Sequence, residues 1–148
     1  MEKYMQIALE EARKAFEEDE VPIGCVVVCN DEIIAREHNT KIQDNNSLFH
    51  AEMKALYKAQ KVLKTKYLYD CTMFVTTEPC AMCAGAIVNT RLGRLVYAVK
   101  EPKTGCCGTK CNLVDGMFNH KTEVVSGVCE EEAAELMTTF FKRKRSEK

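Results

Sequence analysis

The sequence predicts a mixed α/β sandwich, in which a central sheet lies between helices on both of its faces. Two observations favour this fold class. A chain of 148 residues with 46% hydrophobic and 29% charged residues is typical of one soluble domain with one core. After an initial helix and a hairpin, helix-like and strand-like segments alternate, an order that places helices on both faces of one sheet. We therefore expect a single domain over residues 1–148.

Each element is predicted from its side-chain pattern. Residues 3–18 carry apolar side chains at helical spacing, among them Met5 and Leu9. Residues 23–29 form a continuous apolar run rich in valine, which is typical of a strand buried on both faces. Similar patterns predict, in chain order, a tight turn at 30–31, a strand over 32–36, a polar irregular segment over 38–48, a helix over 50–63, a strand over 72–76, a helix over 80–89, a strand over 95–99, a loop over 101–111, a strand over 123–126 and a helix over 130–145.

Charge and hydropathy exclude several classes of protein. The 21 basic and 22 acidic residues give a net charge of −1, which excludes a protein coated with basic residues over its whole surface. Residues 1–20 are polar and lack an apolar core of signal-peptide length, and no apolar run approaches the roughly 20 residues that span a bilayer. Nine cysteines in such a chain indicate thiols in a reducing compartment. We therefore expect a cytoplasmic protein with no membrane partner.

Two predicted helices begin with residues that bind metals. Cys80 and Cys83 lie on one turn at the start of the helix over 80–89, where free N–H groups and the helix dipole favour thiolates. His50 begins the helix over 50–63, and both helices follow strands, beyond whose ends sites form in such sheets. One imidazole and two thiolates are zinc ligands, and three of them leave a fourth position open for water, as in a catalytic site.

Glu52 supplies the base that a catalytic zinc site needs. Such a site requires a group that takes a proton from water and delivers it to the substrate, and Glu52 lies two residues from His50. From the residues alone, Cys80 and Cys83 also suit a redox pair or half of a structural zinc site. A structural site needs a fourth ligand, and one cysteine cluster is near enough in sequence, although its spacing matches no usual zinc motif: Cys106, Cys107 and Cys111.

The motif His-x-Glu followed by Pro-Cys-x-x-Cys is the signature of zinc-dependent deaminases. At these residues the sequence resembles the cytidine deaminase superfamily and, within it, the bacterial tRNA-specific adenosine deaminases. The similarity covers nearly the whole chain. The matching segments are Glu20–Gly24, Asn39, His50–Glu52, Thr77–Ala86, Lys103–Gly105, Asn112, Asn119-His120, Gly127 and Phe140-Phe141.

The resemblance implies a cytidine deaminase-like fold, a three-layer α/β/α sandwich around a mixed five-stranded sheet. It implies hydrolytic deamination of adenosine to inosine at the wobble position of a tRNA anticodon, with one Zn²⁺ per chain. The zinc ligands are then His50, Cys80 and Cys83, and Glu52 carries the proton from water to the base. The implied base-pocket residues are Asn39, Ala51 and Ile23. The implied partners are a tRNA anticodon stem-loop and a second copy of the chain in a homodimer.

The end of the chain and the loop after residue 100 hold the candidate RNA contacts. Residues 142–148 hold five basic side chains and one acidic side chain. Lys and Arg bind phosphates, and aromatic rings stack on unpaired bases. A solvated helix end is the simpler interpretation, because cations also suit the C-terminal dipole of a helix. The candidate contacts, which include a basic helix end over 140–148, are Glu101, Lys103, Asn119, Phe141, Lys142, Arg143 and Arg145.

Two residues depart from the resemblance and leave other functions open. Phe49 stands beside His50 where the similar enzymes carry a small residue, and Glu101 stands where they carry aspartate. These departures leave a deaminase of a free base or nucleoside, of the guanine or cytosine type, as an alternative function. A catalytically inactive RNA-binding subunit is a third alternative, against which the intact Glu52 argues.

Overall fold

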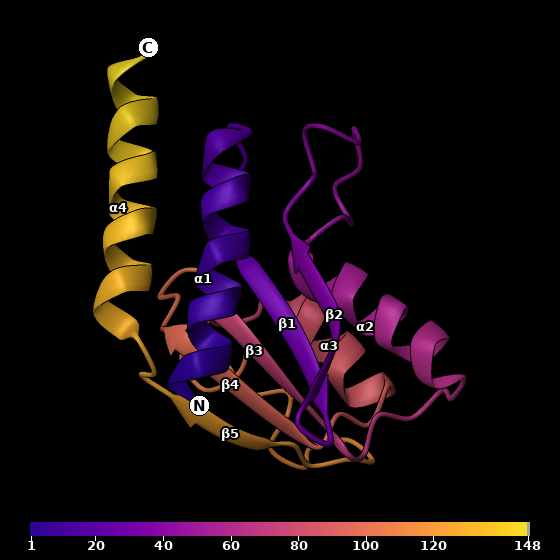
Figure 1. Ribbon diagram of the computed structural model, residues 1–148. Helices are drawn as coiled ribbons and strands as arrows, with labels where there is room; N and C mark the ends of the chain where they lie inside the picture. The colour runs from indigo at the N-terminus through magenta and orange to yellow at the C-terminus, as the bar shows by residue number, and fades with distance from the viewer. Residues whose placement is uncertain (148) are drawn as a thin grey trace.

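The computed structural model describes residues 1–147, and over this range it contains the helices and strands that the sequence predicts, in the predicted order (Figure 1). Some ends differ from the prediction by one or two residues. Lys148, the last residue of the predicted basic end, lies outside the described residues. The elements are α1 (Glu2–Glu17), β1 (Gly24–Cys29), β2 (Glu32–His38), α2 (Ala51–Leu63), β3 (Cys71–Thr77), α3 (Ala81–Asn89), β4 (Arg94–Val99), β5 (Glu123–Ser126) and α4 (Glu130–Ser146).

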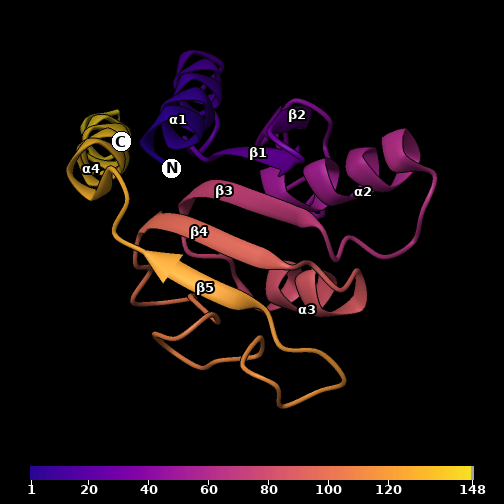
Figure 2. The same cartoon turned by 60° about the horizontal axis from the view of Figure 1, so that its bottom comes forward.

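The strands form one mixed sheet in the order β2-β1-β3-β4-β5, which Figure 2 shows from one edge to the other. β1 is antiparallel to both β2 and β3, whereas β4 is parallel to both β3 and β5. β1 and β2 are joined at Asn30 and Asp31, which have φ values of 51° and 63°. Two successive residues of positive φ are typical of the turn that matches the twist of a hairpin. The strand order and the strand directions together confirm the predicted mixed five-stranded sheet.

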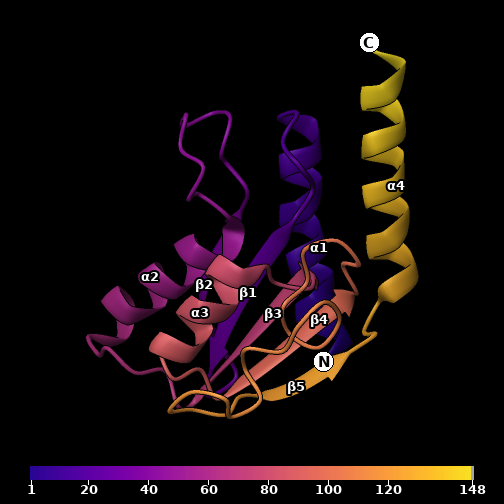
Figure 3. The same cartoon turned by 180° about the vertical axis from the view of Figure 1, so that it is seen from behind.

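The helices cover both faces of this sheet. In Figure 1 α1 lies in front of the strands, and in Figure 3, seen from behind, α2 and α3 lie in front of them. The apolar run of β1 is buried on both faces, as predicted, because its side chains alternate between two core clusters. Cys25 and Val27 pack in the cluster with α2 and α3, and Val26 and Val28 pack in the cluster with α1 and α4. This arrangement is the predicted three-layer α/β/α sandwich.

α1 lies very close to the sheet at Gly24, where an added methyl group would overlap the carbonyl oxygen of Ala8 and the backbone nitrogen of Ala12. α4 stands beside α1, and its C-terminal end projects beyond the sheet (Figure 3). Within residues 1–147, no helix combines the length and the apolar character that crossing a lipid bilayer requires.

Candidate active site

Three metal-binding side chains meet at the N-terminal ends of α2 and α3. His50 and Cys80 directly precede these helices, and both have extended backbone. Nδ1 of His50 lies 3.7 Å from Sγ of Cys80 and 3.6 Å from Sγ of Cys83. All three ligand atoms lie within 4.8 Å of one another. These distances suit one tetrahedral Zn²⁺, whose N and S ligands lie at about 2.0–2.3 Å from the ion and hence about 3.5–4 Å from one another.

The surroundings of Cys80 favour its thiolate form. A hydrogen bond from the Cys83 thiol, together with the contact to His50, lowers the pKa of Cys80 to about 3. The same pairing with Cys80 raises the pKa of Cys83, and burial raises it further. The pKa of His50 is also raised, mainly by its hydrogen bond with Cys80. A thiolate, a second sulfur and an imidazole that converge on one point form the donor set that Zn²⁺ prefers, so the residues present fit this ion.

The carboxyl group of Glu52 is buried beside these ligands. Glu52 lies in the first turn of α2 and is only 3% exposed. Its Oε1 atom has no hydrogen-bond partner among the described residues. Burial raises the pKa of Glu52 to about 7. A carboxyl group in this state takes up and releases a proton near neutral pH, which is what a general acid and base must do.

The three predicted base-pocket residues lie together next to His50. Asn39 is buried, and its Oδ1 atom accepts a hydrogen bond from the backbone N–H of Ala51 at 2.8 Å. The backbone N–H of Asn39 donates to the carbonyl oxygen of Ile23 at 3.2 Å. Ile23 is half-buried and packs against the core cluster of α2 and α3. Ala51 is fully buried and its N–H is bonded to Asn39, so this donor is not free to bind a ligand.

Proteins that are similar in sequence to this chain include deaminases, which agrees with the geometry of the site. The profile of the MafB19-like deaminase family matches residues 1–145. The chain is 49% identical over 148 residues to the tRNA-specific adenosine deaminase of Bacillus subtilis, with 99% of this chain and 92% of the relative covered. It is 41% identical over 149 residues to the tRNA-specific adenosine deaminase of Haemophilus influenzae, with 99% and 86% covered. The chain belongs to the MafB19-like deaminase family, among its tRNA-specific adenosine deaminases.

Solved structures agree with this assignment. A structure from a study of A-to-I editing by tRNA:A34 deaminases at the wobble position of transfer RNA superposes with a TM-score of 0.87 at 38% identity, covering 90% of this chain and 98% of that one. Guanine deaminase from Nitrosomonas europaea superposes with a TM-score of 0.82 at 26% identity, covering 94% and 83%. The predicted fold class and the predicted family are therefore confirmed.

The metal-binding group of this deaminase contains three ligands rather than four. Over residues 1–147, the group of His50, Cys80 and Cys83 is the one place where three or more potential ligands meet, and the cluster Cys106, Cys107 and Cys111 does not join it. All nine cysteines are free thiols. A three-ligand set is typical of catalytic zinc sites and argues against the structural-zinc interpretation.

Two buried glutamates that sequence reasoning missed hold the loops beside the site. The carboxylate of Glu20 accepts the backbone N–H groups of Ile42 and Gln43 at 2.8–3.2 Å. The carboxylate of Glu78 accepts hydrogen bonds from the loop after β4. The sequence did carry a signal, because both glutamates occur inside the segments that match the tRNA deaminases. Glu20 directly precedes Val21-Pro22, and Glu78 directly precedes Pro79. Neither glutamate is a metal ligand or the proton-transfer residue of these segments, so neither was assigned a role from the sequence.

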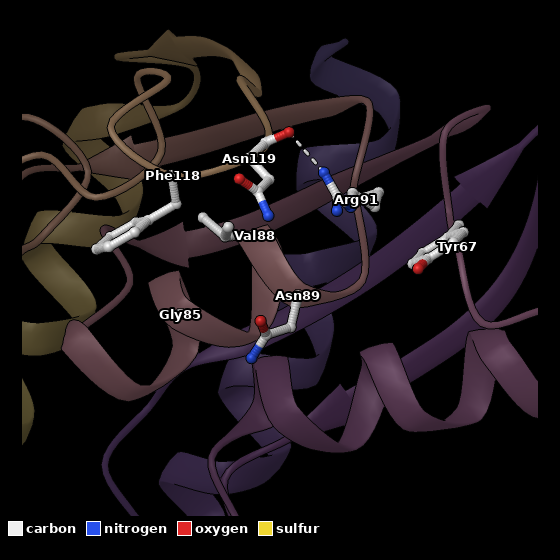
Figure 4. Close-up of a pocket in the computed structure, with 7 residues that line it drawn as sticks. All are labelled: Tyr67, Gly85, Val88, Asn89, Arg91, Phe118 and Asn119. Atoms are coloured by element: carbon white, nitrogen blue, oxygen red, sulfur yellow. Dashed lines mark hydrogen bonds between the residues drawn. The ribbon is translucent and has the colours of Figure 1, made fainter.

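The candidate RNA contacts outside α4 occupy two separate places. Glu101 and Lys103 lie in the loop held by Glu78, and Lys103 is exposed. Asn119 instead lines a cavity of about 490 Å³ beside the C-terminal half of α3, with Arg91 and Phe118 (Figure 4). The backbone oxygen of Asn119 accepts a hydrogen bond from Arg91 at 2.5 Å. Because Cys80 precedes α3 and this cavity adjoins its other end, the structure does not bring Asn119 to the metal ligands.

Some side chains at the C-terminal end of α4 are bound to other parts of the protein, and others are exposed to solvent. Phe140 is buried, whereas Phe141 is 42% exposed, so only Phe141 is available for stacking. The guanidinium of Arg143 lies 4.3 Å from the ring centroid of Phe16 and pairs with Asp19 at 3.2 Å, so it ties α4 to α1. Two other basic groups project into solvent, namely Lys142 and Arg145.

Proposed function

We propose that this deaminase hydrolyses adenosine to inosine at the wobble position of a tRNA anticodon. The observation that carries the proposal is the convergence of three zinc ligands beside the buried carboxyl group of Glu52. It occurs in a chain that is 49% identical, over nearly its full length, to a tRNA-specific adenosine deaminase.

The residues of the site divide the chemistry between them. His50, Cys80 and Cys83 hold one Zn²⁺ per chain, and the bound ion lowers the pKa of a water molecule enough to supply a nucleophile near neutral pH. Glu52, with its pKa near 7, takes a proton and delivers it to N1 of adenine. The oxygen of that water bonds to C6 as N1 is protonated. The same carboxyl group then takes the second proton, from the new hydroxyl at C6, and passes it to the amine, so that the C6–N bond breaks and ammonia leaves. Burial of Glu52 keeps bulk water from competing for this proton.

The base pocket is formed by Asn39, Ala51 and Ile23. The Oδ1 atom of Asn39 is fixed by Ala51, which orients its amide so that the NH₂ group is the one left to donate to the substrate. Ile23 provides an apolar wall for a base that is turned out of its loop, and the buried Ala51 acts through its backbone N–H, which holds Asn39 in place.

A tRNA anticodon stem-loop binds over the site and extends along basic groups. Lys103 and Glu101 contact it from the loop after β4, and Phe141, Lys142 and Arg145 contact it from α4. The structure supports Arg143 less than its neighbours, because its guanidinium is already paired with Asp19. Asn119 contacts the RNA only if the bound RNA extends to the C-terminal end of α3.

We further infer a homodimer in the cytoplasm. Exposed Leu48 and Tyr57, together with Phe49 and Met53, line an apolar groove of about 490 Å³ along α2. Phe49 thus faces this groove, and its bulk adds apolar surface for a second copy of the chain to cover.

Deamination of a free base is the second candidate. The likeness to a guanine deaminase at a TM-score of 0.82 favours it, as does Glu101 in place of the aspartate of the similar enzymes. The two candidates differ in the substrate that the same metal chemistry meets, so substrate choice separates them.

One experiment decides between them. The zinc-loaded protein is incubated with an arginine tRNA whose anticodon begins with adenosine, and inosine is read by sequencing. Free guanine and free cytidine are tested in parallel under the same conditions, with Glu52→Ala as the inactive control. We expect inosine at the wobble position alone. Rapid release of ammonia from guanine or cytidine without inosine in the tRNA would show that the free-base function is correct.

A further inference from the structure

Glu78 makes an unusual set of contacts for a buried carboxylate. It lies between the end of β3 and the start of α3, and it is only 3% exposed. Its Oε1 atom accepts the backbone N–H of Glu101 at 3.1 Å and the hydroxyl of Thr109 at 2.5 Å. Its Oε2 atom accepts the backbone N–H groups of Cys107 and Thr109 at 3.0 and 3.1 Å. Every donor therefore comes from one loop, residues 101–109.

No cation balances this carboxylate. Among residues 1–147, no lysine, arginine or histidine forms an ion pair with Glu78. A buried charge of this kind is stable only while its hydrogen-bond donors stay in place. The path of the loop consequently depends on its hydrogen bonds to this carboxyl group.

The loop also approaches Glu78 as closely as a backbone can. A Cβ atom at Gly105 would lie 2.5 Å from both Cδ and Oε1 of Glu78, so glycine is required there. The backbone N–H of Gly105 donates to the carbonyl oxygen of Glu101 at 2.9 Å, which closes a tight turn. This turn carries exposed Lys103 on its outer side.

The same contacts connect the loop to the metal site. The backbone N–H of Glu78 donates to the carbonyl oxygen of Val99 at 2.9 Å, and the N–H of Cys106 donates to the carbonyl oxygen of Pro79 at 2.9 Å. Pro79 directly precedes the ligand Cys80. The loop is thus fixed to the two residues before a zinc ligand. Apart from the hydroxyl of Thr109, every donor in these bonds is a main-chain N–H group.

We propose that Glu78 is a positioning residue for RNA substrates, which sets the 101–109 loop beside the zinc site so that Lys103 meets the RNA backbone. This inference rests on the proposed function. Glu78 does not touch the substrate or the metal. It acts through the loop, so its loss changes binding of RNA more than the chemical step.

The test compares Glu78→Gln with the wild-type protein on an anticodon stem-loop RNA. The amide NH₂ group of glutamine cannot accept hydrogen bonds, so at least one N–H donor of the loop loses its partner. We expect KM to rise about tenfold, the effect of one hydrogen bond to a charged group, while kcat falls by less than about threefold. Zinc content, measured by atomic emission, stays at one ion per chain.

A double-mutant comparison separates positioning from a general structural role. Lys103→Ala alone raises KM, but in the Glu78→Gln background it adds little, because the displaced loop no longer brings residue 103 to the RNA. Independent, multiplying effects of the two substitutions would overturn the proposal, and so would an unchanged KM for Glu78→Gln.

A milder variant covers the case in which Glu78→Gln does not fold. Thr109→Val removes the hydroxyl donor and keeps the N–H donor, so KM rises by a smaller factor. Thr65→Val is the matched control, because this exposed hydroxyl contacts only the neighbouring backbone of Tyr67. A wild-type KM for Thr109→Val contradicts the proposal. Absence of inosine with the wild-type protein refutes the proposed function itself, and the two failures are thereby distinguished.

Discussion

The buried carboxyl group of Glu52 destabilises the metal-free fold at neutral pH, and Glu52→Gln should therefore stabilise it. Burial raises the pKa of this group from an ordinary 4.5 to about 7. The folded state thus binds the proton more tightly than the unfolded state does, so stability is highest at low pH and is lost as pH rises from 4.5 to 7. A pKa rise of this size corresponds to a cost of about 3 kcal/mol at pH 8. Glutamine has nearly the same shape and carries no charge.

The assay is urea denaturation of chelator-treated wild-type and Glu52→Gln protein, in reducing buffer at pH 5 and pH 8. We expect the variant to be more stable by about 2–3 kcal/mol at pH 8 and by less than about 1 kcal/mol at pH 5. An advantage of the same size at both pH values would refute the reasoning, because an uncharged packing effect does not depend on pH.

The same substitution separates stability from activity. Zinc-loaded Glu52→Gln should keep one ion per chain, because its ligands are unchanged, and should lose activity by a factor of about 10³ or more, because no group remains to move the proton. Loss of the metal together with activity would instead make Glu52 a contributor to the ligand set. Metal content and inosine formation are measured on the same sample.

Three further predictions follow from packing and charge. Lys142→Ala combined with Arg145→Ala should weaken RNA binding and flatten its salt dependence without lowering the melting temperature, whereas Arg143→Ala should lower the melting temperature, because Arg143, unlike Lys142 and Arg145, is tied to Phe16 of α1 and to Asp19; binding titrations at several salt concentrations and thermal melts check both. Glu11 is buried, which raises its pKa, but hydrogen bonds with neighbouring basic groups outweigh burial and the net pKa is lowered. Its stabilising effect is therefore complete above pH 4.5 and lost as pH falls below it, so the stability difference between the wild type and Glu11→Gln should shrink in denaturation curves towards pH 3. Gly24→Ala should cost about 1–3 kcal/mol or more in the free energy of unfolding by urea, because its methyl group must push α1 off β1; wild-type stability would contradict that close packing.

Most of the fold could be predicted because its signals are local. The valine run of β1 and the apolar stripe of α1 follow directly from which side chains the two faces of the sheet bury. The order of the strands is less local. That β4 pairs in parallel with both β3 and β5 depends on contacts between distant segments, and the five-stranded sheet was expected only through the family resemblance.

The site residues that could be predicted are those whose own side chains bind the metal or move the proton. His50, Cys80 and Cys83 are zinc ligands in any fold that brings them together, and their spacing placed two of them on one helical turn. Glu78 could not be found in this way, because its role depends on main-chain N–H groups that every residue except proline possesses. The binding of Arg143 to Asp19 was hidden for another reason, since the two residues lie 124 positions apart.

The anchoring of both site loops by buried glutamates has a consequence for how substrate preference evolves. Glu20 and Glu78 bind mostly backbone N–H groups, so substitutions among the outward side chains of these loops leave the anchors intact. Gly105 is an exception, because its missing side chain is part of the contact. Residues such as Lys103 and Gln43 are thereby free to diverge while the zinc chemistry is inherited unchanged. A scaffold of this kind can change its substrate from an RNA loop to a free base through substitutions in these loops, and every intermediate sequence still folds.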